Sequence, residues 1–392
     1  MVKINSKNKR FTKIEINLAN LENNIKVLKS HLNQPKTRIM AVVKSNAYGH
    51  GMVDISKHLV KCGINILGVA LIEDGIRLRK AGLKGPIYIL GEQPVETVRD
   101  ALKYDFILGI NSFEKAVATS KLSEKFGKRL TVNIKVDTGM NRIGINFKRA
   151  AEEIKKITSL TGLRLEGIFT HFSCASDKDE AYTMMQWNRF LEVLGKLESK
   201  DIRFKLMHCA NSAAFLCHKD MHLDMVRLGI SIYGVSPFND DAEKWLSPEI
   251  IKIIKSLKPV LSLKSRVSFV KSVSSGECIS YGATFKTSKS SVIATIPVGY
   301  ADGYTRLFSN RAKVIIEDEY APVVGNVTMD QIMVDVTDIA NKKNITQGTE
   351  VILIGNSGNK KVTADYLANL VGTISYEILC MLKDGIPRIY IH

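Results

Sequence analysis

The chain has 392 residues, of which 45% are hydrophobic and 24% charged, and its formal net charge is +17. The length exceeds one ordinary hydrophobic core and indicates two domains, and the composition is typical of a globular protein and excludes a disordered chain. No apolar run of roughly 18 residues occurs, so we expect no transmembrane helix and no membrane partner.

The positive charge does not indicate a nucleic-acid partner. Lysines and arginines alternate with acids along helical stretches such as residues 148–156, whereas a nucleic-acid binder gathers them on one face beside aromatic residues. A basic surface of this kind can still steer an anionic ligand, such as a cofactor phosphate, to the protein.

The cysteines are scattered through the chain without a Cys-x-x-Cys pair: Cys62, Cys174, Cys209, Cys217, Cys278 and Cys380. This pattern predicts reduced thiols in the cytoplasm rather than a disulfide framework or a zinc site, and we expect no metal. Residues 1–10 are polar and basic with no apolar segment after them, so we expect no signal peptide.

In chain order, short apolar runs rich in β-branched residues predict eight strands: Met40–Lys44, Ile66–Ala70, Ile87–Leu90, Phe106–Ile110, Val132–Asp137, Gly167–His171, Phe204–Cys209 and Met225–Val226. Amphipathic helices are predicted between them: Leu21–Leu32, Glu73–Ala81, Val95–Leu102, Phe113–Phe126, Arg149–Leu160 and Ala181–Leu197. This alternation predicts an α/β fold with an N-terminal (β/α)8 barrel of TIM type. A doubly wound open sheet is the alternative, and the absence of Gly-x-Gly-x-x-Gly after an early strand disfavours it.

The pattern changes near Leu246-Ser247-Pro248. Beyond Pro259 strands follow one another with few helices, which predicts a mainly-β C-terminal domain. The expected strands are Leu261–Val273, Ser291–Pro297, Lys313–Ile316, Ala321–Val324, Gln331–Val336 and Glu350–Ile354, with one helix at Thr363–Leu370. We expect the barrel domain at residues 12–247 and the β domain at residues 248–392, with residues 1–16 pairing with the β domain.

The segment of residues 41–51, AVVKSNAYGHG, begins as a buried strand and ends in a polar loop with glycines. Lys44 therefore stands at the carboxyl end of a strand, where barrel enzymes hold their active sites. Burying a cation there is costly, so the amine is a candidate for covalent carbonyl chemistry. A surface lysine that keeps its charge in solvent is the alternative.

Tyr48 follows the same strand as Lys44, and further polar residues lie on or after the other predicted strands: Lys135, Asp137, His171, His208, Asn211, Ser212 and Arg227. With Lys44 they resemble, in their order, the fold-type III enzymes that depend on pyridoxal phosphate. Seven stretches narrow the resemblance to bacterial alanine racemases: residues 137–144 (DTGMNRIG), 210–214 (ANSAA), 227–230 (RLGI), 279–285 (ISYGATF), 297–303 (PVGYADG), 327–331 (VTMDQ) and 374–378 (ISYEI). The resemblance runs from Thr12 to Tyr390 and includes both domains.

The resemblance implies two catalytic residues. Lys44 would carry the cofactor and act as one base, and Tyr281 would act as the second base on the opposite face of the substrate. Because a phenol is a weak acid, the site must favour the phenolate or supply a proton relay. Tyr281 belongs to the β domain, and in this family it comes from the other subunit, which implies a head-to-tail homodimer with shared active sites; a tyrosine of the β core is the alternative.

The resemblance also implies the residues that hold pyridoxal phosphate: Lys44, Tyr48, His171, Ser212, Arg227, Gly229, Ile230 and Tyr376. Arg227 would face the pyridine nitrogen, and a guanidinium cannot accept the proton of that nitrogen. This arrangement favours return of a proton to Cα over transamination. His208 would orient Arg227, with a packed core histidine as the alternative, and Asn211 would only shape its turn.

For the substrate carboxylate, the resemblance implies Arg142 and the backbone of Met329, with Tyr300 and Asp330 as neighbours. Lys135 stands where the family often carries a carbamylated lysine that pairs with the arginine. Asn141 replaces a usual glycine, so a residue with a side chain must take the turn, and asparagine tolerates positive φ best.

The implied activity is that of an alanine racemase, an isomerase that supplies D-alanine for peptidoglycan and hence for the cell wall. The small pocket implied near Tyr376 and Met329 favours alanine as substrate. A serine or broader amino-acid racemase is the first alternative, because one methylene or hydroxyl group gives only modest discrimination. A non-catalytic protein that binds pyridoxal phosphate is the second, and the β domain with Tyr281 disfavours it.

Overall fold

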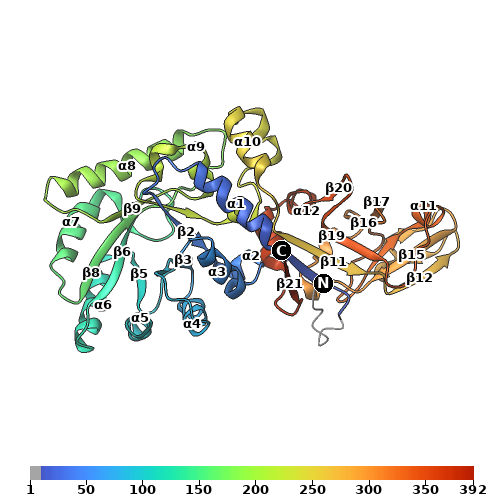
Figure 1. Ribbon diagram of the computed structural model, residues 1–392, viewed down its shortest axis with the longest axis horizontal. Coiled ribbons are helices and arrows are strands. Elements are labelled where there is room, and N and C mark those ends of the chain that lie inside the picture. The colour runs from blue at the N-terminus through green and yellow to red at the C-terminus, as the bar shows by residue number, and fades with distance from the viewer. Residues whose placement is uncertain (1–9) are drawn as a thin grey trace. The chain divides into compact units, whose positions relative to one another are not determined.

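The computed structural model describes residues 10–392, which form two compact units (Figure 1). The barrel unit comprises residues 22–47 and 52–258. The β unit comprises residues up to Leu21, the short segment Tyr48–Gly51, and Pro259–His392. Of the residues on which the absence of a signal peptide was expected, all but Arg10 lie outside the described part.

The barrel unit contains the eight predicted parallel strands, in the order β10-β2-β3-β4-β5-β6-β8-β9. Their bounds are β2 Arg38–Val42, β3 Ile66–Val69, β4 Ile87–Ile89, β5 Phe106–Ile110, β6 Leu130–Asp137, β8 Leu163–Phe169, β9 Leu206–His208 and β10 Met225–Leu228, and β7 Ile145–Asn146 pairs beside β6. Backbone hydrogen bonds from Asp224 to Met207 (3.1 Å) and from Arg227 to Ala210 (3.0 Å) join the two ends of this order. The predicted (β/α)8 barrel is therefore confirmed.

Helices surround these strands in Figure 1. They are α3 Met52–Lys61, α4 Ile72–Lys80, α5 Val98–Tyr104, α6 Phe113–Lys125, α7 Phe147–Thr158, α8 Ala181–Glu198, α9 Ser212–Cys217 and α10 Pro248–Ser256, with short 3-10 turns η1 Val95–Thr97, η2 Lys219–His222, η3 Ile230–Tyr233 and η4 Asp240–Lys244. Local sequence sets their starts: Ser112 caps α6 by accepting from Lys115 N–H, and Ser247 caps α10, whose first residue is Pro248. Helix α1 (Leu18–Ser30) begins in the β unit and continues into the barrel unit.

The barrel interior is packed rather than hollow. One buried cluster takes a side chain from each of five strands: Met40, Ile66, Tyr88, Ile107 and Met225. Strands β3, β4 and β10 are buried along their whole length, as expected for parallel strands covered on both faces. The packed core fixes the strand ends from which the polar side chains project.

The β unit has a sheet of order β17-β16-β19-β11-β1-β21, a three-stranded sheet of order β12-β15-β18 and a small pair β13-β14. Its strands are β1 Lys13–Asn17, β11 Leu261–Arg266, β12 Phe269–Val273, β13 Cys278–Ile279, β14 Phe285–Lys286, β15 Ser291–Ile296, β16 Lys313–Ile316, β17 Glu319–Pro322, β18 Ile332–Asp335, β19 Glu350–Ser357, β20 Lys360–Val362 and β21 Arg388–Ile391. Helices α11 Thr337–Ala340, α12 Ala364–Val371 and α13 Ser375–Met381 and turns η5 Tyr281–Ala283, η6 Tyr300–Asp302 and η7 Arg306–Phe308 complete it. The mainly-β prediction is confirmed.

Two features of the β unit depart from a simple run of hairpins. Strand β1 pairs antiparallel with β11 and parallel with β21, so Lys13–Asn17 and Arg388–Ile391 lie side by side in one sheet. The strand predicted over Leu261–Val273 is two strands, β11 and β12, which belong to different sheets. The chain changes sheet at Val267 and Ser268, whose N–H groups donate to Thr349 and Thr295 respectively.

Among the described residues, no helix is both long and apolar enough to cross a membrane.

Candidate active site

Lys44 follows β2 after one residue, Val43, and begins a left-handed turn labelled α2 (Lys44–Tyr48). Ser45, Asn46, Ala47 and Tyr48 all have φ between +52° and +56°. Non-glycine residues rarely adopt this conformation, which costs roughly 1–2 kcal/mol per residue. A hydrogen bond joins the turn to the start of α3, because the Asn46 side chain accepts from Met52 N–H at 2.7 Å. The backbone is thus held in a strained form beside the candidate lysine.

Arg227 on β10 is buried, and no carboxylate compensates it among the ion pairs of the described residues. Nη1 donates to His208 Nδ1 at 2.8 Å, and Nη2 donates to His171 Nδ1 at 2.9 Å. Nη2 also donates to the Thr170 and Cys209 carbonyl oxygens at 2.7 and 3.0 Å. All four contacts use Nη1 and Nη2, so the Nε–H group keeps no partner among the described residues. Burial lowers the pKa of Arg227 to about 10, which leaves it cationic at neutral pH.

These contacts fix the protonation of both histidines. Because a guanidinium only donates, each Nδ1 must be an unprotonated acceptor and each neutral ring carries its proton on Nε2. Burial, and then the charge of Arg227, hold the pKa of His171 and of His208 well below the usual value. His208 Nε2 faces the Asn133 side-chain amide, whose nitrogen lies 3.5 Å away and whose oxygen has no partner. Turning this amide by half a rotation lets its oxygen accept the Nε2 proton.

Positive charge accumulates around Lys135 on β6. The pKa of Lys135 is lowered to about 8, chiefly by burial and in addition by the charges of Arg142, Arg227 and Lys44, while Asp137 opposes them. The ammonium lies 5.8 Å from the centre of the Phe169 ring. Three further cationic side chains thus lie near Lys135 with one carboxylate, an arrangement that favours the binding of an anion among them.

The loop after β6 places Arg142. Asp137 accepts from the N–H groups of Gly139 and Asn141 through one carboxylate oxygen, at 3.0 Å each. Asn141 has φ of +55°, the positive value predicted for it. Arg142 is exposed at the tip of this loop.

The predicted phosphate-binding residues of the barrel meet between α9 and the turn after β10. Gly229 N–H donates to Ser212 Oγ at 3.1 Å, and Ile230 follows in the same turn. Asn211 caps α9 by accepting from Ala214 N–H, in line with its expected role of shaping the turn. Hydroxyl and backbone N–H groups gathered in this way suit a phosphate.

The remaining predicted residues lie in the β unit. The rings of Tyr48 and Tyr376 have centres 6.0 Å apart, and burial raises the pKa of both hydroxyls. Tyr281 is 76% exposed, and its backbone carbonyl oxygen accepts from the Asn326 side-chain amide at 2.7 Å.

The loop after Asn326 brings two further predicted residues together. Tyr300 N–H donates to the Thr328 carbonyl oxygen at 3.1 Å, and Ala301 N–H to that of Met329 at 3.0 Å. A Cβ at Gly299 would lie 2.2 Å from the Met329 carbonyl oxygen, so only glycine fits there. Asp330 follows Met329 and is exposed.

One buried residue of this region escaped the sequence analysis. Gln186 on α8 donates to the His171 carbonyl oxygen at 3.2 Å and accepts from Ser173 N–H at 2.9 Å, and it is fully buried. It therefore fixes the chain just beyond β8. A polar side chain at a buried helical position was the available signal.

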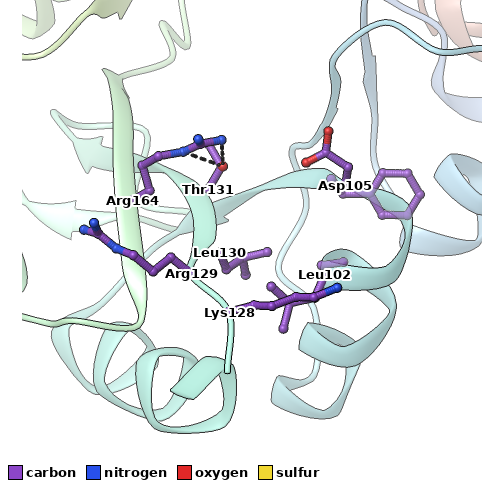
Figure 2. A pocket seen from close by; sticks show the side chains of 9 residues that line it. Leu102, Asp105, Lys128, Arg129, Leu130, Thr131 and Arg164 are labelled. Atoms are coloured by element: carbon purple, nitrogen blue, oxygen red, sulfur yellow. Dashed lines mark hydrogen bonds between the residues drawn. The ribbon is translucent and has the colours of Figure 1, made fainter. Parts of the chain in front are cut away.

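A pocket of about 390 Å³ lies at the opposite, amino-terminal end of the barrel strands (Figure 2). It is lined in part by Asp105, Lys128, Arg129 and Arg164, and Arg164 donates to Thr131 Oγ1 at 2.6 and 3.0 Å. It contains none of the predicted site residues.

The barrel residues fit pyridoxal phosphate. The cations near Lys135 favour an anionic group, the Ser212–Gly229 turn presents donors of the kind a phosphate needs, and the Arg227 Nε–H remains available for the ring nitrogen.

Comparisons with known proteins agree with this arrangement. Residues 16–237 match the alanine racemase N-terminal domain, and residues 260–390 match the alanine racemase C-terminal domain. An alanine racemase of Halothermothrix orenii is 42% identical over 386 residues, which cover 98% of each chain. One of Methanococcus maripaludis is 42% identical over 379 residues, or 96% of this chain and 98% of the relative.

Solved structures give the same result. The alanine racemase of Clostridium difficile 630 superposes with a TM-score of 0.90 at 37% identity, covering 98% of this chain and 97% of the other. The alanine racemase from Bacillus anthracis with bound L-Ala-P has a TM-score of 0.89 at 34% identity, covering 98% and 96%. Both domains and the order of the site residues along the chain place this protein in the alanine racemase family.

Proposed function

We propose that the protein interconverts L-alanine and D-alanine with pyridoxal phosphate as cofactor, using Lys44 and Tyr281 as two opposed bases. The observation that carries this proposal is the buried Arg227 guanidinium. His171 and His208 accept its hydrogen bonds, in the place that a carboxylate partner of an arginine would otherwise take. Pyridoxal phosphate, when bound, supplies the electron sink that makes the Cα proton of an amino acid acidic.

Each residue has a role that its surroundings support. Lys44 attaches the cofactor, and Ser212, Gly229, Ile230, Tyr48 and Tyr376 hold its phosphate. Arg227 offers Nε–H to the ring nitrogen and cannot accept a proton from it. Electron density then stays nearer Cα, which favours return of the proton there.

Racemisation requires removal of a proton from one face of Cα and return of a proton to the other. The Lys44 amine serves one face and the Tyr281 hydroxyl the other. Arg142 and the backbone of Met329 hold the substrate carboxylate and so keep Cα between the two bases. Gln186 fixes the His171 backbone and keeps the ring beside Arg227.

We also propose that two copies of the chain share their active sites, with Tyr281 supplied by the partner. The exposure of Tyr281 supports this, since a catalytic tyrosine needs a protein neighbour that excludes water from it. Met329 is also strongly exposed, although its carbonyl oxygen is fixed by the backbone of Ala301.

The proposed setting is the bacterial cytoplasm, where the product D-alanine enters peptidoglycan synthesis. All six cysteines are free, which fits a reducing compartment.

The test is incubation of purified protein, with and without added pyridoxal phosphate, with L-alanine or L-serine, followed by chiral chromatography. We expect D-alanine to form faster than D-serine, and only in the presence of the cofactor. Lys44→Ala should lose both the visible absorbance of the lysine-bound cofactor and all activity. Faster conversion of serine would assign a serine racemase, and bound cofactor without conversion of either amino acid would refute catalysis.

A further inference from the structure

Helices α1 and α3 bring together a histidine, a cysteine and a carboxylate, none of which is a predicted active-site residue. Glu22 lies on α1, His58 on α3, and Cys62 directly follows α3. His58 Nε2 and Glu22 Oε1 are 2.9 Å apart. One ligand atom from each of the three residues lies within 4.8 Å of the other two, and no other such group occurs among the described residues.

Helical geometry explains the arrangement on α3. Residues four apart lie one above the other on the same face of a helix, so the side chains of His58 and Cys62 both face Glu22. A second contact fixes the helices further along, because Lys29 Nζ donates to the Cys62 carbonyl oxygen at 2.8 Å. The three ligand groups are thus held by two elements that are joined at two points.

We propose that Glu22, His58 and Cys62 form a binding site for a Zn²⁺ ion. Imidazole nitrogen, thiolate sulfur and carboxylate oxygen are the three donor types that zinc takes in proteins, at distances of about 2.0–2.3 Å. Tetrahedral donors at those distances are about 3.5 Å apart, which requires the observed group to close slightly. The Glu22 side chain is 45% exposed and can move inward, and water takes the fourth position.

When Zn²⁺ binds, bonds to the metal replace the His58–Glu22 hydrogen bond and the S–H bond of Cys62. In the pair His58 Nε2–H donates to the Glu22 oxygen, so binding requires the Nε2 proton to move by exchange with solvent to Nδ1 before the Nε2 lone pair meets the metal. The Glu22 oxygen turns to the metal, and the Cys62 thiol gives its proton to solvent as the Zn–S bond forms. The His58–Glu22 pair is lost and two stronger bonds replace it.

No metal was expected from the sequence, which has no Cys-x-x-Cys pair. No short motif marks this site, since Glu22 and His58 are 36 positions apart and lie on two helices. The chain also contains a natural comparison. Glu180 and His218 are 3.8 Å apart and Cys217 adjoins His218, yet these three do not meet the distance condition that Glu22, His58 and Cys62 satisfy. His218→Gln is therefore the matched control for His58→Gln.

The first experiment titrates the cofactor-loaded enzyme with Zn²⁺ in competition with a chromophoric chelator. We expect one ion per chain, with binding weakened in both Cys62→Ser and His58→Gln by more than the roughly 10–100-fold that loss of an outer-shell partner costs. His218→Gln should bind as the wild type does. No competition by the wild-type protein, or equal binding by Cys62→Ser, would overturn the proposal.

A second experiment needs no variant and so does not depend on the folding of one. Wild-type enzyme is treated with iodoacetamide with and without Zn²⁺, and alkylation is followed by peptide mass spectrometry. We expect zinc to slow labelling of Cys62 several-fold and to leave the exposed Cys278 and Cys380 unchanged. Equal labelling of Cys62 with and without zinc would contradict the assignment.

Discussion

Arg227 is a buried cation whose neighbours are two neutral histidines and two carbonyl oxygens rather than a carboxylate. A carboxylate partner would neutralise the guanidinium and lower the positive potential at the ring nitrogen. Neutral acceptors satisfy its N–H groups and leave its full charge in place. For this arrangement to persist, Nδ1 of each histidine must stay unprotonated.

His208 must stay unprotonated at Nδ1 to accept from Arg227. Because the pKa of His208 is held well below 6.5 in the folded protein, the unfolded chain binds a proton that the folded chain does not as the pH falls below 6.5. The free energy of unfolding should then decrease by about 1.4 kcal/mol per pH unit from this residue alone. His208→Gln should reduce the slope below pH 6.5 in urea unfolding, and His392→Gln, at the exposed end of the chain, should not. A slope unchanged by His208→Gln would contradict the assignment.

Lys135 is expected to react with CO₂. A pKa of about 8 makes its amine neutral at a much lower pH than an ordinary lysine, and a neutral amine reacts with CO₂ to give a carbamate and a proton. The negative carbamate would offset Arg142 and Arg227. At fixed pressure of ¹³C-labelled CO₂, we expect a carbamate carbon signal that grows as the pH rises through 8.

The control for this signal is Lys115, which is ion-paired with Glu92. The signal should disappear in Lys135→Met and persist in Lys115→Met. A spectrum without the signal at any pH would show that another anion balances these charges.

At the scale of elements, the left-handed turn after β2 determines where Lys44 stands. Glycine relieves the left-handed penalty of about 1–2 kcal/mol, whereas in an ordinary helix it costs about 1 kcal/mol relative to alanine. Ala47 in the turn and Ala116 in α6 are both fully buried. We predict that Ala47→Gly lowers the free energy of unfolding by about 1–2 kcal/mol less than Ala116→Gly does, because glycine relieves the left-handed penalty only at residue 47, as measured by urea unfolding. Equal losses would mean that the turn stores no strain.

The sequence predicted the strands of the barrel because each is a continuous apolar run, and it predicted positive φ at Asn141 because a glycine is usual there. It missed the left-handed turn, since Ser45, Asn46 and Ala47 have no preference that favours it strongly. It omitted α3, whose start depends on a hydrogen bond from Met52 to Asn46. The break at Val267 depends on pairing with Thr349, far along the chain. Local pattern thus predicts the elements, and long-range contacts decide their ends.

The candidate site shows the same division. Motifs identified Lys44, Arg227 and Tyr281, because the chemistry requires those residue types. The sequence could not reveal that His171 and His208 both accept from Arg227, or that Gln186 holds the backbone of His171. These contacts arise only when separate strands and α8 come together.

At the scale of the whole molecule, the proposed bases belong to different units: Lys44 to the barrel unit and Tyr281 to the β unit. If two copies share their sites, Lys44→Ala and Tyr281→Phe are inactive alone, yet a mixed dimer has one intact site. Equal mixing with subunit exchange should restore about a quarter of the wild-type activity, because half of the dimers are mixed and each has one working site of two. No recovery after demonstrated exchange would place both bases of a site in one chain.

Lys44 and Tyr281 are proposed to act on opposite faces of Cα. The most direct test is solvent-deuterium exchange at Cα, measured separately for L-alanine and D-alanine with wild-type enzyme and with Tyr281→Phe. The wild type should exchange both enantiomers. Tyr281→Phe should keep its cofactor and lose exchange of one enantiomer far more than of the other, because Lys44 still serves one face. Equal losses for both enantiomers would contradict the two-base account.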